Sequence, residues 1–283
     1  MLDGCAYILT VDVGNTFIRF GLFAEDSAAA QERPLATCEI TTPARITADE
    51  ARMRLAQVMG ALAADAGVPG VLVPAAAVLS CVVPALERPW KAALSRTCTG
   101  RVLTVGPGLK TGMPVHYDDP AEIGPDRIAD AVAARAVYGS PCIVIDLGTT
   151  TNIEVIDAHG TFVGGVIAPG LALGARSLSA AAARLPQVEP SAPTHVIGRN
   201  TREAMRSGVV LGEVARIDGM LDMVLAEMRA TKAAGEGDVP IIITGDDAEA
   251  LAALVGHSLT VDDALTLRGL AELYHINQKP RRA

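Results

Sequence analysis

The chain has 283 residues, of which 50% are hydrophobic and only 3% are aromatic, and its formal net charge is -8. A chain of this length and apolar content buries one large core or two moderate ones, so global disorder is excluded, and two domains are the commoner arrangement. The aliphatic composition is typical of an α/β protein. No run of Lys or Arg is long enough to neutralise a nucleic-acid backbone, which argues against nucleic acid as the main partner.

The cysteines and the apolar segments indicate where the protein works. The five cysteines have no CxxC spacing, and an odd number cannot pair fully within one chain. Residues 1–4 include no basic residue and lead into an apparent strand, which is unlike a signal peptide. Residues 66–86 are uncharged, but their prolines and glycines break any single helix. We therefore predict a cytoplasmic protein with no membrane partner. The cysteines are Cys5, Cys38, Cys81, Cys98 and Cys142.

The first half of the chain begins with a predicted β-hairpin. Tyr7–Val13 is rich in β-branched residues and ends in Gly-Asn, after which residues 17–23 resume a strand pattern. A third strand is expected at residues 34–40, and Thr47 with Glu50 forms a capping box before a helix that runs to about residue 64. The other elements expected in this half are a strand at 75–80, a helix after Pro84 and a strand at 101–105.

The second half repeats the opening of the first. Residues 11–16 and 145–150 share the pattern apolar-Asp-apolar-Gly-polar-Thr, and Asp146 follows Asp12 by 134 residues. Two ordinary Asp-Gly hairpin turns are the alternative explanation. The duplication instead predicts two similar domains, 1–120 and 121–283, with both hairpin tips lining one nucleotide cleft. Elements are expected here at 126–138 (helix), 142–147, 152–156 and 161–167 (strands), 171–183 and 201–230 (helices), 240–244 (strand), from 246 (helix) and 263–275 (helix).

The two hairpin tips carry residues suited to phosphate. A carboxylate just before a Gly-rich tip can hold hydrated Mg²⁺ or face a phosphate, while the amides that follow cradle oxygens. No G-x-x-x-x-G-K-[ST] loop is present. The paired motifs resemble those of the acetate kinase, sugar kinase, Hsp70 and actin superfamily. That resemblance implies a duplicated α/β fold: two actin-like, ribonuclease H-like lobes, each a mixed sheet with flanking helices.

A narrower resemblance rests on the segment Gly124-Pro125-Asp126-Arg127. Type III pantothenate kinases carry a tract of the form Tyr-x-x-Pro-x-x-Val-Gly-Ala-Asp-Arg, and this chain is similar to it, with Pro125 in place of the usual Ala. Further matches to the family lie, in order, at residues 12–16, 80–84, 146–149, 164–170, 185–186 and 197–201.

The resemblance implies an ATP-dependent kinase that phosphorylates pantothenate, in the first step of coenzyme A biosynthesis, and works as a homodimer. It implies that Asp126 is the catalytic base and that Asp146 binds a monovalent cation, K⁺ or NH₄⁺. Mg²⁺ would accompany ATP, with Asp12 as a weaker candidate ligand. The implied ATP and phosphate contacts are Asp12, Val13, Gly14, Asn15, Thr16, Phe17, Ile18, Arg19 and Thr149. The implied pantothenate contacts are Gly124, Pro125, Asp126, Arg127, Thr201 and Tyr117.

The residues themselves support a special role for Asp126. An Asp-Arg pair at a helix start places a carboxylate beside a guanidinium and the positive end of the helix, and both neighbours are expected to keep it ionised. A helix cap with a surface ion pair is the simpler alternative. Phosphoryl transfer needs positioning, charge neutralisation and one orienting carboxylate. We assign that last role to Asp126 and a clamping role to Arg127.

Two segments depart from the family pattern. Thr-Gly-Gly is usual after the late strand near the adenosine, whereas this chain has Asp246 and Asp247 after Thr244-Gly245. The second tip reads Thr-Thr-Thr-Asn at 149–152, where Thr-Ala-Thr-Thr is common. These changes keep three alternatives open: a homologue with weakened catalysis that serves as a binding or regulatory protein, a kinase for another small hydroxyl compound, and an actin-like assembly protein.

Overall fold

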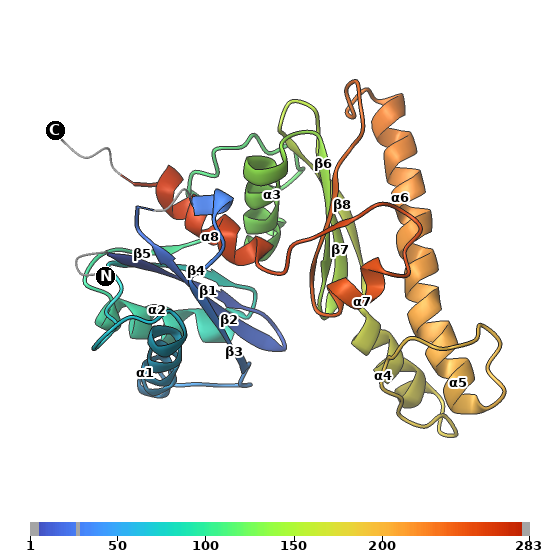
Figure 1. Cartoon of the computed structure of the whole chain (residues 1–283), viewed down its shortest axis with the longest axis horizontal. Helices are drawn as coiled ribbons and strands as arrows, with labels where there is room; N and C mark the ends of the chain where they lie inside the picture. The colour runs from blue at the N-terminus through green and yellow to red at the C-terminus, as the bar shows by residue number, and fades with distance from the viewer. Residues whose placement is uncertain (1–5, 27–28, 279–283) are drawn as a thin grey trace. The chain divides into compact units, whose positions relative to one another are not determined.

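A computed structural model describes residues 6–26 and 29–278, and the chain divides into two compact units. The first unit is Met1–Val137 with Ala264–Ala283, and the second is Tyr138–Asp263. Figure 1 shows a sheet with flanking helices in each unit. The prediction of a cytoplasmic location rests in part on Cys5 and residues 1–4. These five residues lie outside the described ones.

The first unit is built on a five-stranded mixed sheet. Its strand order is β3-β2-β1-β4-β5, in which β1 pairs antiparallel with β2 and parallel with β4. This confirms the predicted opening hairpin and the strands that follow it. The strands are β1 (Tyr7–Val13), β2 (Phe17–Ala24), β3 (Ala36–Thr41), β4 (Ala76–Cys81) and β5 (Val102–Thr104).

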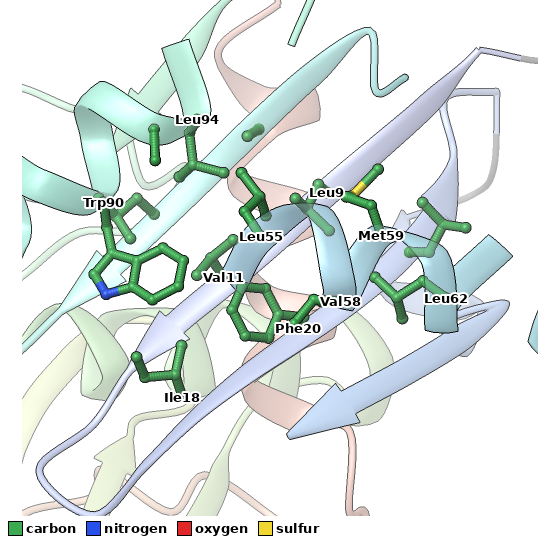
Figure 2. Packing of buried hydrophobic residues seen from close by; sticks show 14 of the residues in the cluster. Leu9, Val11, Ile18, Phe20, Leu55, Val58, Met59, Leu62, Trp90 and Leu94 are labelled. Carbon is green, nitrogen blue, oxygen red and sulfur yellow. The ribbon is translucent and has the colours of Figure 1, made fainter. Parts of the chain in front are cut away.

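Two helices, α1 (Ala48–Asp65) and α2 (Pro84–Thr97), cover one face of this sheet. Alternate residues of a strand point to the same face, so Leu9 and Val11 of β1 enter one core with Leu55 of α1 and Trp90 of α2 (Figure 2). Burial of large apolar side chains such as these removes apolar surface from water, which stabilises the folded unit.

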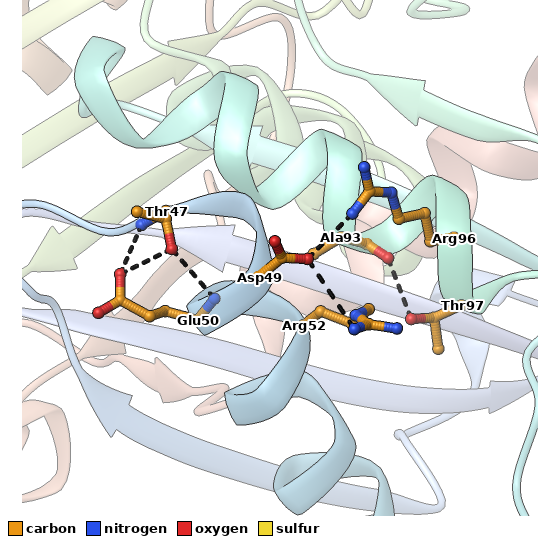
Figure 3. A network of polar contacts seen from close by, with 7 residues as sticks. All are labelled: Thr47, Asp49, Glu50, Arg52, Ala93, Arg96 and Thr97. Atoms are coloured by element: carbon orange, nitrogen blue, oxygen red, sulfur yellow. Dashed lines mark hydrogen bonds and ion pairs between the residues drawn. The ribbon is translucent and has the colours of Figure 1, made fainter.

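The start of α1 is fixed by the predicted capping box (Figure 3). Thr47 Oγ1 accepts a hydrogen bond from the Glu50 amide, and Glu50 Oε2 accepts from the Thr47 amide at 2.8 Å. Asp49 contacts Arg96 of α2 at 3.1 Å, which ties the two helices together beside the sheet.

The opposite face of the first sheet lies against α8 (Leu265–Ile276), which packs on β1, β2 and β4. Gly269 of α8 in turn lies against the backbone of Ala129 in α3 (Pro125–Tyr138). Thr10 and Asp12 point to this face, because they alternate with the core residues of β1. The short 3₁₀ segments η1 (Ala29–Gln31) and η2 (Pro120–Glu122) complete the described elements of this unit.

The units differ from the expected ranges 1–120 and 121–283 in two places. Helix α3 belongs with the first unit, as does α8, although the sequence pattern placed both in the second half. The reason is packing: α8 covers the first sheet, and Arg135 of α3 donates to the Gly112 carbonyl at 2.6 Å. An amphipathic pattern predicts that a helix is half-buried but not which sheet it covers.

The second unit repeats the topology of the first. Its strand order is β10-β9-β6-β7-β8, with an antiparallel β6–β7 hairpin and a parallel β6–β9 pair, so each sheet presents its first hairpin in the same place. The strands are β6 (Cys142–Leu147), β7 (Thr150–Ile156), β8 (Phe162–Pro169), β9 (Ile241–Gly245) and β10 (Thr260–Val261).

Helix α6 (Gly212–Ala230) packs on one face of the second sheet, where Ile217 and Leu221 meet Ile143 and Ile243. The remaining helices are α4 (Leu171–Ala181), α5 (Thr201–Arg206) and α7 (Ala248–Ala252). Within residues 6–26 and 29–278, no helix combines the length and apolar character that crossing a membrane requires.

The helix expected at 201–230 is not uniform. A five-residue π-helical segment, Ser207–Leu211, separates α5 from α6. Its residues, Ser-Gly-Val-Val-Leu, are mostly weak helix formers, so the regular hydrogen-bond ladder is easily shifted there. Strand β10 was not expected, because two residues are too few to show a strand pattern.

Candidate active site

The first hairpin tip, residues 14–16, lies between β1 and β2. Gly14 donates its amide to the Phe17 carbonyl at 3.0 Å, and the Thr42 hydroxyl donates to the Gly14 carbonyl at 2.8 Å. Asn15 and Thr16 are exposed. The tip is therefore held by its neighbours while its outer residues face solvent.

Asp12 lies at the end of β1, beside the tip, and is only 8% exposed. In the sheet it is paired with Arg19 of β2 and Ser80 of β4. Its Oδ1 accepts no hydrogen bond from any described residue. Burial raises the pKa of Asp12 to about 6, and the carboxylate of Asp126 adds to that rise, while Ser80 and Arg19 oppose it. A buried oxygen without a donor, close to a second carboxylate, is a site that a cation would stabilise.

Arg19 is oriented at the edge of the same hairpin. Its Nε contacts Glu39 Oε2 of β3 at 3.0 Å, and its guanidinium carbon lies 5.9 Å from the centre of the Phe17 ring. The cross-strand pair and the aromatic ring restrict the guanidinium, which lowers the entropy lost when it meets an anion.

Asp126 lies in the first turn of α3, after Pro125. Its Oδ1 accepts a hydrogen bond from the Arg127 amide at 2.8 Å. A Cβ at Gly124 would overlap this carboxylate oxygen, so the glycine makes room for it. Arg127 itself is buried, with 5% of its surface exposed.

The pKa of Asp126 is shifted in the direction opposite to the one that its neighbours in the sequence suggest. We expected Arg127 and the helix end to keep the carboxylate ionised. Burial is the largest effect and raises the pKa of Asp126 above its ordinary value, although the Arg127 amide and guanidinium act to lower it. The side chain is more basic than the sequence alone suggested, which suits a group that accepts a proton.

The second tip, Gly148-Thr149, has the same construction. Asp146 is the last residue but one of β6, as Asp12 is of β1, and it is paired in the sheet with Asn152 of β7 and Thr244 of β9. The Gly148 amide donates to the Thr150 carbonyl at 2.9 Å. Oxygen-bearing side chains on all three strands suit a hard cation such as K⁺.

Two glycines support this tip from behind. The Gly170 amide donates to the Thr149 carbonyl at 3.0 Å, and a Cβ there would overlap the Gly148 carbonyl. A Cβ at Gly245 would overlap the Leu147 carbonyl and lie 2.7 Å from Asp146 Oδ1. On two sides of the tip, the backbone therefore approaches so closely that only glycine fits.

Comparison with known proteins decides the family. The family model described as type III pantothenate kinase matches residues 8–223. A type III pantothenate kinase from Nocardia farcinica is 40% identical over 285 residues, covering 97% of this chain and 99% of the relative. Another from Koribacter versatilis is 37% identical over 280 residues, covering 97% of each.

The chain belongs to the type III pantothenate kinase family.

Solved structures agree with the fold of that family. A conserved Campylobacter jejuni protein, described as a Baf family transcriptional activator, superposes with a TM-score of 0.56 at 18% identity, over 95% of this chain and 98% of that one. MreB 5 of Spiroplasma citri, solved with AMPPNP, gives a TM-score of 0.50 at 12% identity, over 96% and 95%. At these identities the likeness shows the duplicated actin-like fold alone.

Thr201, expected from the family match, is exposed in the first turn of α5. Asn200 caps this helix, its side chain accepting from the Glu203 amide at 3.0 Å. A cavity of about 660 Å³ opens beside the helix start, within the second unit. Its lining residues are Thr194, His195, Val196, Ile197, Arg199 and Glu203.

The other expected site residues divide between the units. The first unit brings Asp126 close enough to Asp12 to raise the pKa of Asp12. It also contains Tyr117, a half-buried residue in the segment of chain that joins β5 to η2. Asp146, Thr149 and Thr201 lie in the second unit. Among the described residues, no cluster of three or more His, Cys, Asp or Glu side chains could hold a metal ion.

Sequence reasoning gave no role to Ser80. Ser80 belongs to one of the segments that match the family, and it is fully buried beside Asp12, where it lowers the pKa of that carboxylate. One signal in the sequence could have identified Ser80. It is a polar residue near the end of a predicted strand, and the neighbouring parallel strand carries an Asp at the same end.

Proposed function

We propose that this chain transfers the γ-phosphoryl group of ATP to the primary hydroxyl of pantothenate, the first step of coenzyme A biosynthesis. One observation carries the chemistry: Asp126, half-buried at the start of α3 and held by the Arg127 amide, has a raised pKa beside a second carboxylate, Asp12. Full-length similarity to curated type III pantothenate kinases supports the substrate.

In this mechanism Asp126 orients the hydroxyl and accepts its proton. The hydroxyl oxygen bonds to the γ-phosphorus as the bond between that phosphorus and the oxygen shared with the β-phosphate breaks, and ADP leaves. A carboxylate whose pKa is raised accepts a proton more readily than an ordinary Asp, because the proton transfer becomes less unfavourable. Arg127 offsets the negative charge that gathers on the transferred group.

The ATP phosphates are assigned to both tips. In the first unit, the segment 12–19 is assigned to the phosphates, with Asn15 and Thr16 at its exposed tip and the oriented guanidinium of Arg19 beside them, whereas Val13 and Ile18 are buried in the core. In the second unit, Thr149 offers its amide and hydroxyl. Pantothenate is assigned to Gly124, Pro125, Asp126, Arg127 and Thr201, with Tyr117 as a weaker contact.

Two cations complete the proposal. Mg²⁺ accompanies ATP and neutralises phosphate charge, and Asp12 would hold it or its water, since the unpaired Oδ1 fits a cation. K⁺ or NH₄⁺ would lie at Asp146, among the oxygens of Asn152 and Thr244.

We further propose that the protein is a cytoplasmic homodimer. Large apolar side chains are exposed on the second unit, among them Ile167 of β8 at 61% and Met223 of α6 at 58%. Exposed apolar side chains such as these are what an interface between two identical chains would bury. Light scattering of the purified chain at micromolar concentration measures this, and a fully active monomer would contradict it.

A coupled assay with pantothenate, ATP, Mg²⁺ and K⁺ tests the activity. ADP release that depends on pantothenate is expected. ATP binding without turnover would instead favour a homologue with weakened catalysis, and turnover with a different hydroxyl compound would reassign the substrate. No observation on this chain favours either alternative.

A further inference from the structure

Glu213 is a buried acid that the proposed mechanism does not use. It lies in the first turn of α6, and only 5% of its surface is exposed. A carboxylate in such a place is costly unless donors surround it, so a buried Glu is retained where its contacts are needed.

Both carboxylate oxygens of Glu213 are engaged. Oε1 accepts a hydrogen bond from the Thr151 hydroxyl at 2.6 Å, and Oε2 is paired with the guanidinium of Arg216, one turn further along α6. The same Arg216 nitrogen donates to the Pro169 carbonyl at 2.6 Å. The helix is thereby connected to β7 directly and to the end of β8 through Arg216.

These two attachment points flank the second tip. Thr151 is two residues beyond Thr149 and is paired in the sheet with Leu147, the last residue of β6. Pro169 is paired with Thr150, and the residue after it, Gly170, donates to the Thr149 carbonyl. A shift of either strand would therefore move the tip.

A π-helical segment, Ser207–Leu211, ends two residues before Glu213. Each π turn holds about one residue more than an α turn, so the segment changes which face of the following helix meets the sheet. The segment is itself anchored, because the Ser207 hydroxyl donates to the Val196 carbonyl at 2.5 Å and Val210 is buried in the core.

Arg216 explains why a negative charge is tolerated here. A lone carboxylate behind a phosphate-binding tip would repel the phosphates, whereas a paired guanidinium cancels most of that field. The pair is shielded on the Glu213 side and partly exposed on the Arg216 side, where 34% of the arginine side chain is accessible.

We infer that Glu213 is a positioning residue that, through Thr151 and Arg216, holds the second tip in the geometry that receives the ATP phosphates. This inference rests on the proposed function, because the tip is a phosphate site only if the chain binds ATP. The hydroxyl of Thr151 is the link that can be removed with least disturbance.

The test compares two substitutions at one position. Thr151→Val keeps the shape and the β-branch but removes the donor, while Thr151→Ser keeps the donor. We expect Thr151→Val to raise the KM for ATP about tenfold and to change the KM for pantothenate by less than about twofold, and we expect Thr151→Ser to stay within about twofold of wild type for both. Equal KM values for ATP in Thr151→Val and wild type would overturn the inference.

A matched control removes a different contact of the same helix. Asp218 of α6 contacts His257 Nδ1 at 2.9 Å and accepts from the Gly256 amide. Asp218→Asn weakens this attachment, so the melting temperature should fall while both KM values stay unchanged. If it raised the KM for ATP as much as Thr151→Val does, loosening of α6 in general would explain the effect and the inference would fail.

Calorimetric titration with MgATP, without pantothenate, separates this inference from the proposed function. If wild type binds ATP but does not phosphorylate pantothenate, the substrate assignment fails, and weaker ATP binding by Thr151→Val still supports the role of Glu213. Wild type that does not bind ATP would overturn both.

Discussion

At the scale of single residues, Asp12 has a carboxylate whose burial lowers the stability of the folded chain. Its pKa is about 6 in the folded chain, against an ordinary 3.8. As pH rises through this interval the unfolded chain loses the proton first, so the free energy of unfolding falls, and the loss persists above pH 6. A residue kept at such a cost in stability is typical of a functional site.

Asp12→Asn should therefore make the protein more stable and less active. We expect a gain on the order of 2–3 kcal/mol at pH 7.5, without Mg²⁺ or nucleotide, and little change near pH 3.5, where Asp12 is protonated in the folded chain. Thermal melting of both proteins across this pH range measures the gain. An unchanged or lower melting temperature at pH 7.5 would show that Asp12 is satisfied in the native state.

Asp246 offers a second test at a single residue. It follows Gly245, whose backbone lies against Asp146, and its amide donates to the Leu147 carbonyl at 2.6 Å. A carboxylate so close to the second tip repels a polyphosphate. Asp246→Gly restores the usual family residue and should lower the KM for ATP roughly two- to fivefold, as expected for one partly exposed charge. If the KM is unchanged, the side chain points away from the nucleotide.

At the scale of elements, the positions of strands and helices in the sequence were more predictable than the surfaces against which the helices pack. The β1–β2 hairpin follows from alternating β-branched residues and a Gly-Asn tip, and α1 follows from Thr47 and Glu50. The packing of α8 on the first sheet could not be predicted, because an apolar stripe does not identify the surface that covers it.

The candidate site was predictable in its residues and not in its environment. Asp12 and Asp126 stand out in the sequence by motif and by family resemblance. Their raised pKa values depend on burial by distant segments, which no local pattern reveals. Glu213 was missed for the same reason, since its partner Thr151 lies 62 residues earlier in the chain.

The cap of α1 gives a prediction for an element remote from the proposed chemistry. Thr47→Ala removes the hydroxyl that accepts from the Glu50 amide. The expected cost is about 1 kcal/mol of unfolding free energy, with kcat and both KM values unchanged. Denaturant titration measures the cost. A change in kinetics without loss of stability would mean that this end of the first unit takes part in the reaction.

At the scale of the whole molecule, the duplication has produced two tips with different chemistry. Both sheets share one topology, and both tips follow an Asp at the end of the central strand. In the sheet Asp12 lies opposite a cationic residue, Arg19, whereas Asp146 lies opposite the neutral Asn152. The second tip thus has less positive charge of its own, which is consistent with a bound monovalent cation there.

Cation dependence follows from that difference. At constant ionic strength, activity should be several-fold higher in KCl or NH₄Cl than in NaCl, because fixed oxygens replace the hydration shell best for one ion size. Asp146→Asn should remove most of the difference between the salts. Equal rates for wild type in NaCl and KCl would exclude a cation role for Asp146, even if the kinase reaction is confirmed.

The substitution Asp126→Asn tests the central claim most directly. Asn preserves the size of the side chain and can still accept from the Arg127 amide, so the helix start should survive and the melting temperature should not fall. Without a base, kcat for pantothenate phosphorylation should drop by about 10²- to 10⁴-fold, with a much smaller change in ATP binding. A folded Asp126→Asn variant with nearly normal kcat would contradict the claim that Asp126 activates the hydroxyl.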